Sequence, residues 1–213
     1  MSEPTVPACV VGIVVFHGVE ELDFSAPYAV FSALRRLQIV SGASDLPETH
    51  VITISRTSGI IHGANGLRWL PDYDLSMCPE LSVLVVPGSG EIGDATVPEM
   101  EEGGLWDFVH EQASHARAVA GVGTGTFVLA KAGVLSGKRV ATRAKFRDGL
   151  ARFAGVTVVD APVVEDGAVW TAAAGAWGVP LGLGLIARLY GRPVARRTAA
   201  ELDAAWDETM ITP

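Results

Sequence analysis

Residues 117–133 read RAVAGVGTGTFVLAKAG, and they give the clearest indication of the fold class. An apolar, strand-like run over residues 117–122 passes through Gly-Val-Gly-Thr-Gly at 121–125 into a helix-like run over residues 127–133. A strand that turns through G-x-nucleophile-x-G into a helix is a nucleophile elbow, which holds one reactive side chain in a strained turn above a sheet. Here Gly123 occupies the nucleophile position. The sequence therefore predicts an elbow without a covalent thiol or hydroxyl nucleophile at position 123.

The segments around the elbow alternate between buried strands and helices. β-Branched runs typical of buried parallel strands lie at residues 10–16, 50–55 and 82–86, and a short strand is expected at residues 139–142. Helical spacing covers residues 25–37 (with Ser25 as N-cap and Pro27 in the first turn), 98–116, 145–153, 175–190 and 193–206. Hairpins are expected over residues 60–70, turning at 64–66, and over residues 156–172, turning at 165–167. This pattern predicts a doubly wound α/β sheet with β-hairpin additions, in a single domain over residues 1–213.

The composition excludes several classes of function. The 24 acidic residues outnumber the 16 basic ones, giving a net charge of -8, which argues against nucleic acid as the main partner. The apolar runs are shorter than the roughly 20 residues that a membrane span needs, and the first residues do not resemble a secretory signal. Two cysteines make no disulfide framework. We therefore expect a cytoplasmic protein without a membrane partner.

Three motifs carry a family resemblance. Residues 16–27 (FHGVEELDFSAP) resemble an F-x-G-x-x-x-L-D-x-x-G-P opening, residues 86–90 (VPGSG) are similar to a P-G-G loop, and residues 122–137 (VGTGTFVLAKAGVLSG) are similar to V-C-T-G-x-x-x-L-x-x-A-G-L-L-x-G. Their order and spacing resemble the DJ-1/PfpI superfamily, in particular its isonitrile hydratase-like branch and the amidase-like domains of AraC-type regulators. The resemblance implies a flavodoxin-like mostly parallel sheet sandwiched by helices, and a homodimer.

The departures from the family pattern gather at one place. The family's reactive cysteine falls on Gly123, and its T-H-W segment falls on residues 142–144, which read Thr-Arg-Ala. Its late glycine-rich segment falls on residues 172–180, where Trp177 and Pro180 replace a small residue and an aspartate. We expect a remodelled pocket with added room near positions 123 and 144 and an indole at 177.

Asp23 is the candidate acid/base. Ligands of an open α/β sheet lie beyond the carboxyl ends of its strands, and Asp23 follows the first strand at that edge. A carboxyl buried among Phe16, Leu22 and Phe24 should have a raised pKa, which suits proton transfer near neutrality. The resemblance adds that the matching acidic residue of relatives bonds the thiol and moves protons. The alternative is a carboxyl that only bonds local backbone.

Backbone donors at the elbow form the second candidate feature. The N–H groups of Ser89, Gly123 and Thr124 are predicted to make an anion or oxyanion pocket at the start of the elbow helix. The Thr124 side chain either bonds a ligand or caps that helix. Glu20 and Glu21 are expected to be solvated loop residues.

The remaining polar candidates are less specific. Arg143 and Trp177 either clamp a substrate or serve as a surface salt bridge and core packing, and His17 either contacts substrate or lies on a surface loop. The other four histidines lack metal-ligand spacing, and Gly121-x-Gly123-x-Gly125 lacks the third glycine of a dinucleotide motif, so neither a metal nor a cofactor is expected. Cys9 and Cys78 are expected at the opposite edge of the sheet.

Two hypotheses remain from the sequence. The first is a cofactor-free, cysteine-independent enzyme that uses Asp23 and the elbow amides on a small, largely apolar substrate, in hydratase/lyase or cyclase/isomerase chemistry. The second is a catalytically silent ligand-binding or sensing domain. After Tyr190 the chain is expected to have no room for the helix-turn-helix region of the regulators.

Overall fold

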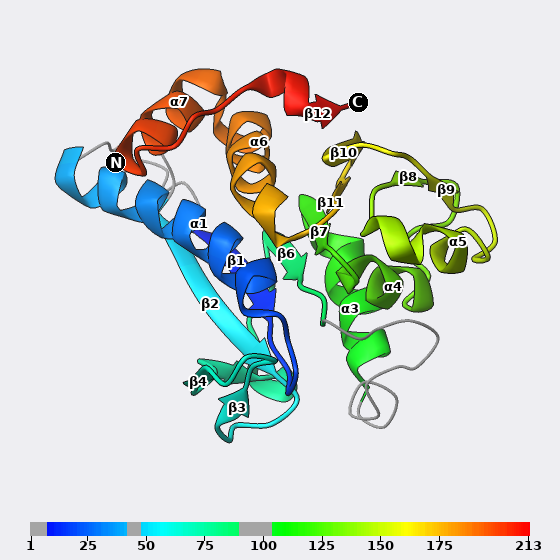
Figure 1. The fold of residues 1–213 in the computed structure, drawn as a ribbon. Coiled ribbons are helices and arrows are strands. Elements are labelled where there is room, and N and C mark those ends of the chain that lie inside the picture. Colours follow the sequence, from blue (N-terminus) through cyan, green and yellow to red (C-terminus); the bar gives the residue numbers. More distant parts are fainter. Residues whose placement is uncertain (1–7, 42–47, 90–103) are drawn as a thin grey trace.

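The computed structural model describes residues 8–41, 48–89 and 104–213. Its centre is an eight-stranded sheet (Figure 1). The strands are β1 (Cys9–Val14), β2 (Thr49–Ser55), β5 (Tyr73–Asp74), β6 (Val83–Val86), β7 (Ala118–Val122), β10 (Val163–Asp166), β11 (Val169–Ala172) and β12 (Ile211–Thr212). Their order across the sheet is β12-β10-β11-β7-β6-β1-β2-β5.

The central strands form a parallel, doubly wound core. Strands β2, β1, β6, β7 and β11 run parallel, and β10 pairs antiparallel with β11. Every residue of β6 and β7 is buried, as expected for β-branched and small residues covered on both faces. The chain changes winding direction between β1 and β6, which is where open α/β sheets bind ligands. The predicted flavodoxin-like, mostly parallel sheet is confirmed.

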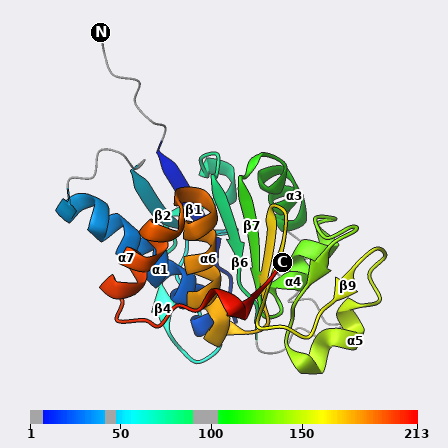
Figure 2. The same ribbon diagram turned by 90° about the horizontal axis from the view of Figure 1, so that it is seen from above.

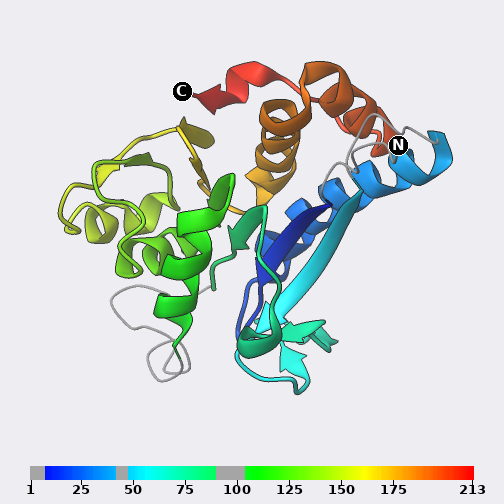
Figure 3. The same cartoon turned by 180° about the vertical axis from the view of Figure 1, so that it is seen from behind.

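Helices cover both faces of the sheet. One face carries α1 (Glu21–Ser41), α6 (Gly178–Tyr190) and α7 (Arg192–Glu201), which pack against one another; the other carries α3 (Leu105–His115) and α4 (Gly125–Lys131), with α5 (Arg147–Leu150) beside α4 (Figures 2 and 3). Short 3-10 turns are η1 (Leu75–Met77), η2 (Ala144–Phe146), η3 (Gly175–Trp177) and η4 (Glu208–Met210). Within the described ranges, no helix combines the length and the apolar character needed to span a bilayer.

Several helix boundaries differ from the predictions. The helix expected over residues 145–153 is the 3-10 turn η2 followed by the short α5, and α6 begins after η3. Helix α1 starts at Glu21, so Ser25 lies inside the helix and is not its N-cap, and Pro27 lies further inside. The carboxylates of Glu21 and Asp23 fall in the first turn, where the helix dipole favours negative charge. Helix α7 ends at Glu201 because Asp203 turns the chain with a φ of 49°. The helix predicted over residues 98–116 is present as α3, and its residues 98–103 lie outside the described ranges.

The hairpin predictions are confirmed in part. Strands β3 (Ile61–His62) and β4 (Arg68–Trp69) pair antiparallel, as the Asn-Gly turn predicts. The second hairpin consists of β10 and β11 alone. The prediction that it begins at residue 156 is wrong, because β9 (Thr157–Val158) pairs in parallel with β8 (Arg139–Val140). Pro162, which has no N–H for a strand ladder, separates β9 from β10.

Candidate active site

The Asp23 carboxyl lies in the first turn of α1, at the carboxyl edge of the sheet, and is fully buried. Its Oδ2 accepts a hydrogen bond from the Gly88 N–H (3.2 Å), in the loop that follows β6. Its Oδ1 accepts one from Arg143 Nη2 (3.2 Å), which also makes an ion pair. The topology thus brings together three segments that are far apart in the sequence.

The environment of Asp23 changes its proton affinity. Burial raises the pKa of Asp23 to about 6, while the Arg143 charge and the bonds from Arg143 and Gly88 lower it, and the Glu20 carboxylate raises it further. The direction of this shift agrees with the expectation from the sequence. A carboxyl with this value exchanges a proton readily near neutral pH.

Gly123 sits on the turn between β7 and α4 with a φ of 58°, a left-handed conformation that glycine adopts without steric cost. A Cβ built on Gly123 would lie 2.5 Å from Asp23 Oδ2 and 3.2 Å from Arg143 Nε. The prediction of added room at position 123 is therefore wrong. The carboxylate and the guanidinium already occupy the space that a side chain on the elbow would need.

Two further glycines let the backbone approach Asp23 closely. A Cβ on Gly175 would lie 2.7 Å from Asp23 Oδ1, and a Cβ on Gly88 would lie 2.9 Å from Asp23 Oδ2 and collide with Thr124 Oγ1. Backbone at positions 88, 123 and 175 therefore encloses the carboxyl. Burial of Asp23 follows from these contacts.

Arg143 closes the remaining side of the carboxyl. It precedes η2, and its side chain is 25% exposed. Its Nη2 lies 4.0 Å from Glu20 Oε2 as well as 3.2 Å from Asp23 Oδ1. Its Nε is buried and has no hydrogen-bond partner among the described residues. The surface salt bridge considered for Arg143 is instead a pair with a fully buried carboxyl.

The elbow was predicted to present three free backbone N–H groups, and this prediction is wrong for two of them, because they are already hydrogen-bonded within the protein. The Ser89 N–H donates to Thr124 Oγ1 (3.0 Å), and the Gly123 N–H donates to the Ala172 carbonyl (2.9 Å). The Thr124 hydroxyl donates to the Ser89 carbonyl (2.8 Å) and makes no capping bond to α4. Thr124 therefore joins the loop after β6 to the elbow. Gly90, the last residue of the predicted P-G-G-like loop, lies outside the described residues.

His17 and Trp177 lie in other surroundings. His17 Nδ1 accepts the His62 N–H (3.2 Å), and the two imidazole rings lie 5.6 Å apart, so His17 contacts the β3–β4 hairpin. Trp177 ends η3, is half-buried and packs against the hydrophobic core. Trp177 is the residue expected to place an indole near the site. It follows Gly175, whose backbone approaches the Asp23 carboxyl, by two positions.

Glu20 lies in the loop before α1, as predicted, whereas Glu21 is the first residue of α1, and both side chains accept exposed hydrogen bonds from the hairpin. Glu21 Oε1 accepts the Asn65 N–H (2.7 Å), and Glu21 Oε2 and Glu20 Oε1 accept from Asn65 Nδ2 (2.6 and 3.2 Å). The Asn-Gly turn of the hairpin thus binds the start of α1. Sequence reasoning assigned Asn65 only to the turn, because a side-chain partner 44 residues away leaves no local signal.

Sequence reasoning also missed Gly88 and Thr142. The Gly88 backbone N–H binds the Asp23 carboxyl. Thr142, which follows β8, donates its hydroxyl to the Gly123 carbonyl (2.9 Å) and so holds the elbow in place. The sequence signals that could have indicated these two residues were the Pro-Gly pair at 87–88 and the threonine at 142, which matches the first residue of the family's T-H-W segment.

Both cysteines lie away from this carboxyl. Cys9 is buried at the first residue of β1, the end opposite Asp23. Cys78 follows η1, and burial raises its pKa to about 11, which leaves the thiol protonated and weakly reactive. Among the described residues no histidine, cysteine, aspartate and glutamate side chains cluster in a way that could hold a metal ion.

The chain is similar to known proteins in both sequence and fold. The isonitrile hydratase of Pseudomonas putida is 31% identical over 195 residues, covering 92% of this chain and 78% of that protein. A ThiJ/PfpI family protein from Pseudomonas syringae has a TM-score of 0.81 at 23% identity, covering 96% of this chain and 78% of that one. An AraC family transcriptional regulator from Pseudomonas putida has a TM-score of 0.75 at 22% identity, covering 91% and 99%. The sequence profile of the DJ-1/PfpI family matches residues 10–185, and the chain therefore belongs to the DJ-1/PfpI family.

Proposed function

We propose that the chain is a cofactor-free, cysteine-independent enzyme that adds or removes water on a small, largely apolar substrate. A related proton-transfer rearrangement or cyclisation uses the same groups. The observation that carries this proposal is the fully buried Asp23 carboxyl, with a pKa of about 6, held beside the elbow glycine by Arg143. The similarity to an isonitrile hydratase supports hydration as the reaction class.

Hydration of an isonitrile, R–N≡C, illustrates how one carboxyl can suffice. Protonated Asp23 donates its proton to the terminal carbon, and water adds to that carbon. The added water then returns a proton to the Asp23 carboxylate and leaves R–N=CH–OH, which tautomerises to the formamide R–NH–CHO. Asp23 ends in its starting state, so the cycle needs neither a thiol nor an external oxidant or reductant.

In this proposal Arg143 has two roles: it covers the Asp23 carboxyl in the absence of substrate, and it supplies a hydrogen-bond donor during the reaction. Asp23 is fully buried, whereas Arg143 is 25% exposed, so movement of Arg143 opens the carboxyl to substrate. The unpartnered Nε–H then supplies a donor for the oxygen of the formamide product, in place of the amides that are already bonded. Trp177 is the proposed apolar contact of the substrate body.

A second candidate function is a catalytically silent ligand-binding or sensing domain. The observation that favours it is the closed Asp23–Arg143 pair, which occupies the space that a side chain at position 123 would need. The structural similarity to an AraC family regulator is compatible with this alternative. In either case we propose one domain that pairs as a homodimer in the cytoplasm and takes a small molecule as its partner, not nucleic acid or a membrane.

The test is a turnover screen with small alkyl and aryl isonitriles, with formamide followed by NMR. Wild type and Asp148→Asn should turn over alike, because Asp148 is exposed and is not among the groups that act on the Asp23 carboxyl. Asp23→Asn should lose turnover and retain substrate binding measured by calorimetry. Binding without turnover in the wild type would favour the silent domain, and full activity in Asp23→Asn would refute the acid/base role.

A further inference from the structure

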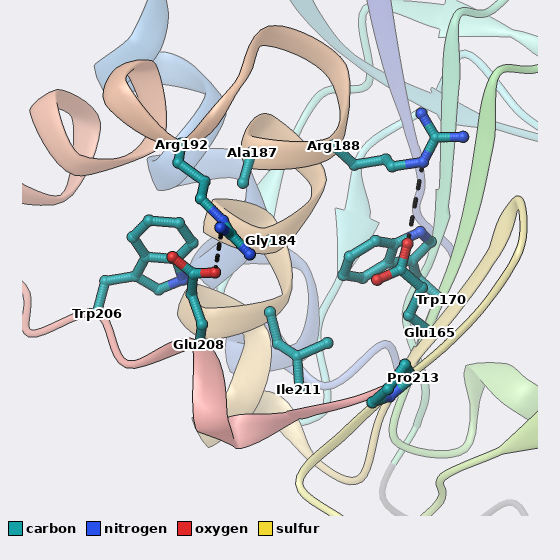
Figure 4. A pocket seen from close by; sticks show the side chains of 10 residues that line it. All are labelled: Glu165, Trp170, Gly184, Ala187, Arg188, Arg192, Trp206, Glu208, Ile211 and Pro213. Carbon is teal, nitrogen blue, oxygen red and sulfur yellow. Dashed lines mark ion pairs between the residues drawn. The ribbon is translucent and has the colours of Figure 1, made fainter.

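A cavity of about 330 Å³ lies away from the Asp23 carboxyl, between α6 and the sheet edge formed by β10 and β12. Figure 4 shows its two ion pairs on opposite sides, with α6 between them. Cavities of roughly 300 to 1,000 Å³ are the usual size for small-molecule sites. None of its lining residues contributes to the contacts of Asp23.

The cavity has an apolar interior made of two indoles and small residues. Trp170 and Trp206 form walls, and Gly184 and Ala187 of α6 together with Ile211 of β12 complete the lining. A Cβ on Gly184 would lie 2.6 Å from Ile211 Cδ1 and 2.7 Å from Trp170 Cζ3, so these three residues pack tightly on one side. The missing side chain at Gly184 therefore lets α6 pack closely on Trp170 and Ile211.

Two buried donors in the cavity lining lack acceptors. The Nε1–H groups of Trp170 and Trp206 are buried and have no hydrogen-bond partner in the described part of the chain. Trp170 is only 2% exposed. Its cross-strand neighbour is Glu165, and Figure 4 shows the Trp170 indole nitrogen on the side of Glu165 and Arg188. An unsatisfied buried N–H is costly, so a ligand oxygen placed here would be stabilised.

The two ion pairs at the cavity differ in tightness. Arg192 Nε lies 2.7 Å from Glu208 Oε2, which is a close pair. Arg188 Nε lies 3.9 Å from Glu165 Oε1, beyond hydrogen-bond distance, and the Arg188 side chain is 63% exposed. The Arg188 guanidinium therefore keeps donors for an anionic ligand, and guanidinium binds carboxylate in a two-donor geometry.

We propose that this cavity is a second binding site, for a small carboxylic acid with an aryl or alkyl body. The carboxylate oxygens accept from Arg188 and from the Trp170 indole N–H, and the carbon body extends over Ala187 toward the Trp206 indole. None of the residues that line the cavity acts on Asp23, so this proposal does not rest on the chemistry proposed there. Binding in the cavity is measured without turnover.

The probe is 4-phenylbutyrate, titrated into the full chain by calorimetry, with 4-phenylbutyramide as its neutral counterpart. We expect one saturable site for the acid and an affinity at least about tenfold lower for the amide, corresponding to one charge-assisted contact. Arg188→Gln should lower the affinity for the acid by about tenfold. Arg197→Gln, on an exposed position of α7, is the matched control and should bind like wild type.

Ala187→Phe fills the cavity and should abolish binding. If this variant does not fold, as judged by circular dichroism, Arg188→Gln decides the outcome because its side chain lies at the surface. Equal affinity for acid and amide, unchanged binding in Arg188→Gln, or no saturation would overturn the proposal. Loss of binding in Asp23→Asn but not in Ala187→Phe would place the acid at the elbow and overturn it as well.

Discussion

The Asp23–Arg143 pair occupies the space that a side chain at position 123 would need. Gly123 allows the arrangement because it has no Cβ and accepts a φ of 58°. A thiol at this position would share the space with the carboxylate, since a Cβ would lie 2.5 Å from Asp23 Oδ2. In this chain the carboxylate contacts the elbow directly, with Arg143 as its counter-ion.

The first prediction at this scale concerns pH and stability. The folded-state pKa of Asp23, about 6, exceeds its ordinary value of 3.8, so the folded protein holds this proton more tightly than the unfolded chain. The resulting stabilisation is complete below pH 3.8 and is lost as pH rises through about 6. A shift of roughly 2 units corresponds to about 3 kcal/mol.

Urea unfolding between pH 4 and pH 7 measures this effect. The free energy of unfolding of wild type, relative to Asp23→Asn, should fall by about 2 to 3 kcal/mol across this range. The asparagine variant removes the titrating group and keeps an acceptor for the Gly88 N–H. Parallel pH curves for the two proteins would show that Asp23 has no raised pKa.

The second prediction concerns Gly123→Ala and Gly123→Cys. Both should lower the free energy of unfolding by roughly 1 to 2 kcal/mol, because a non-glycine residue is strained at this φ and displaces the Asp23 carboxylate. Gly123→Cys should also impair native function and react readily with iodoacetamide, because Arg143 and the start of α4 favour the thiolate. Unchanged stability and function, or an ordinary thiol pKa, would show that position 123 is not beside the pair.

At the scale of elements, the β3–β4 hairpin is bound to the start of α1. The Gly18 N–H donates to the His62 carbonyl (2.8 Å), and the Ala64 N–H donates to the Val19 carbonyl (2.9 Å). Asn65 adds its bonds to Glu20 and Glu21, and the Phe24 and Trp69 rings stack with centroids 4.7 Å apart. The hairpin therefore holds the segment that carries Asp23.

The third prediction tests this connection. Asn65→Ala removes two side-chain bonds to carboxylates and should lower the free energy of unfolding by about 1 kcal/mol, a modest value because the bonds are exposed. Hydrogen exchange at Gly18 and Ala64 should accelerate, while exchange in β6 stays unchanged as the internal control. Equal acceleration in β6 would mean global destabilisation in place of local release.

The elements that could be predicted from sequence are those with strong local patterns. The buried runs of β1, β6 and β7 and the Asn-Gly hairpin are where the residues indicate them. Strand β12 was missed because two residues give no periodic signal, and its pairing with β10 is set by tertiary contact. The α1 start was misplaced because Pro27 suggested a first turn, although the helix tolerates it further inside.

The candidate site was predictable to the same extent. The position and raised pKa of Asp23 follow from the strand-edge rule and its apolar neighbours. The identity of the Asp23 partner could not be predicted in this way, because Arg143 lies 120 residues away in the sequence. The Ser89 amide was wrongly predicted free, since only the folded chain shows that Thr124 Oγ1 accepts its proton.

At the scale of the whole molecule, we predict a homodimer. The family resemblance implies pairing, and the exposed apolar side chains Leu67 and Leu70 flank Trp69 on the hairpin. Light scattering at micromolar concentration should give a mass twice the 22.3 kDa of one chain. A single species at the monomer mass would contradict this prediction.

We propose that Asp23 performs the proton transfer without a thiol. The most direct measurement is the pH dependence of kcat/KM for isonitrile hydration in the Cys9→Ser/Cys78→Ser variant. We predict activity equal to wild type that falls as pH rises through about 6, where Asp23 ionises and can no longer donate the first proton. Loss of activity in this cysteine-free variant, or a profile that does not change near pH 6, would contradict the account.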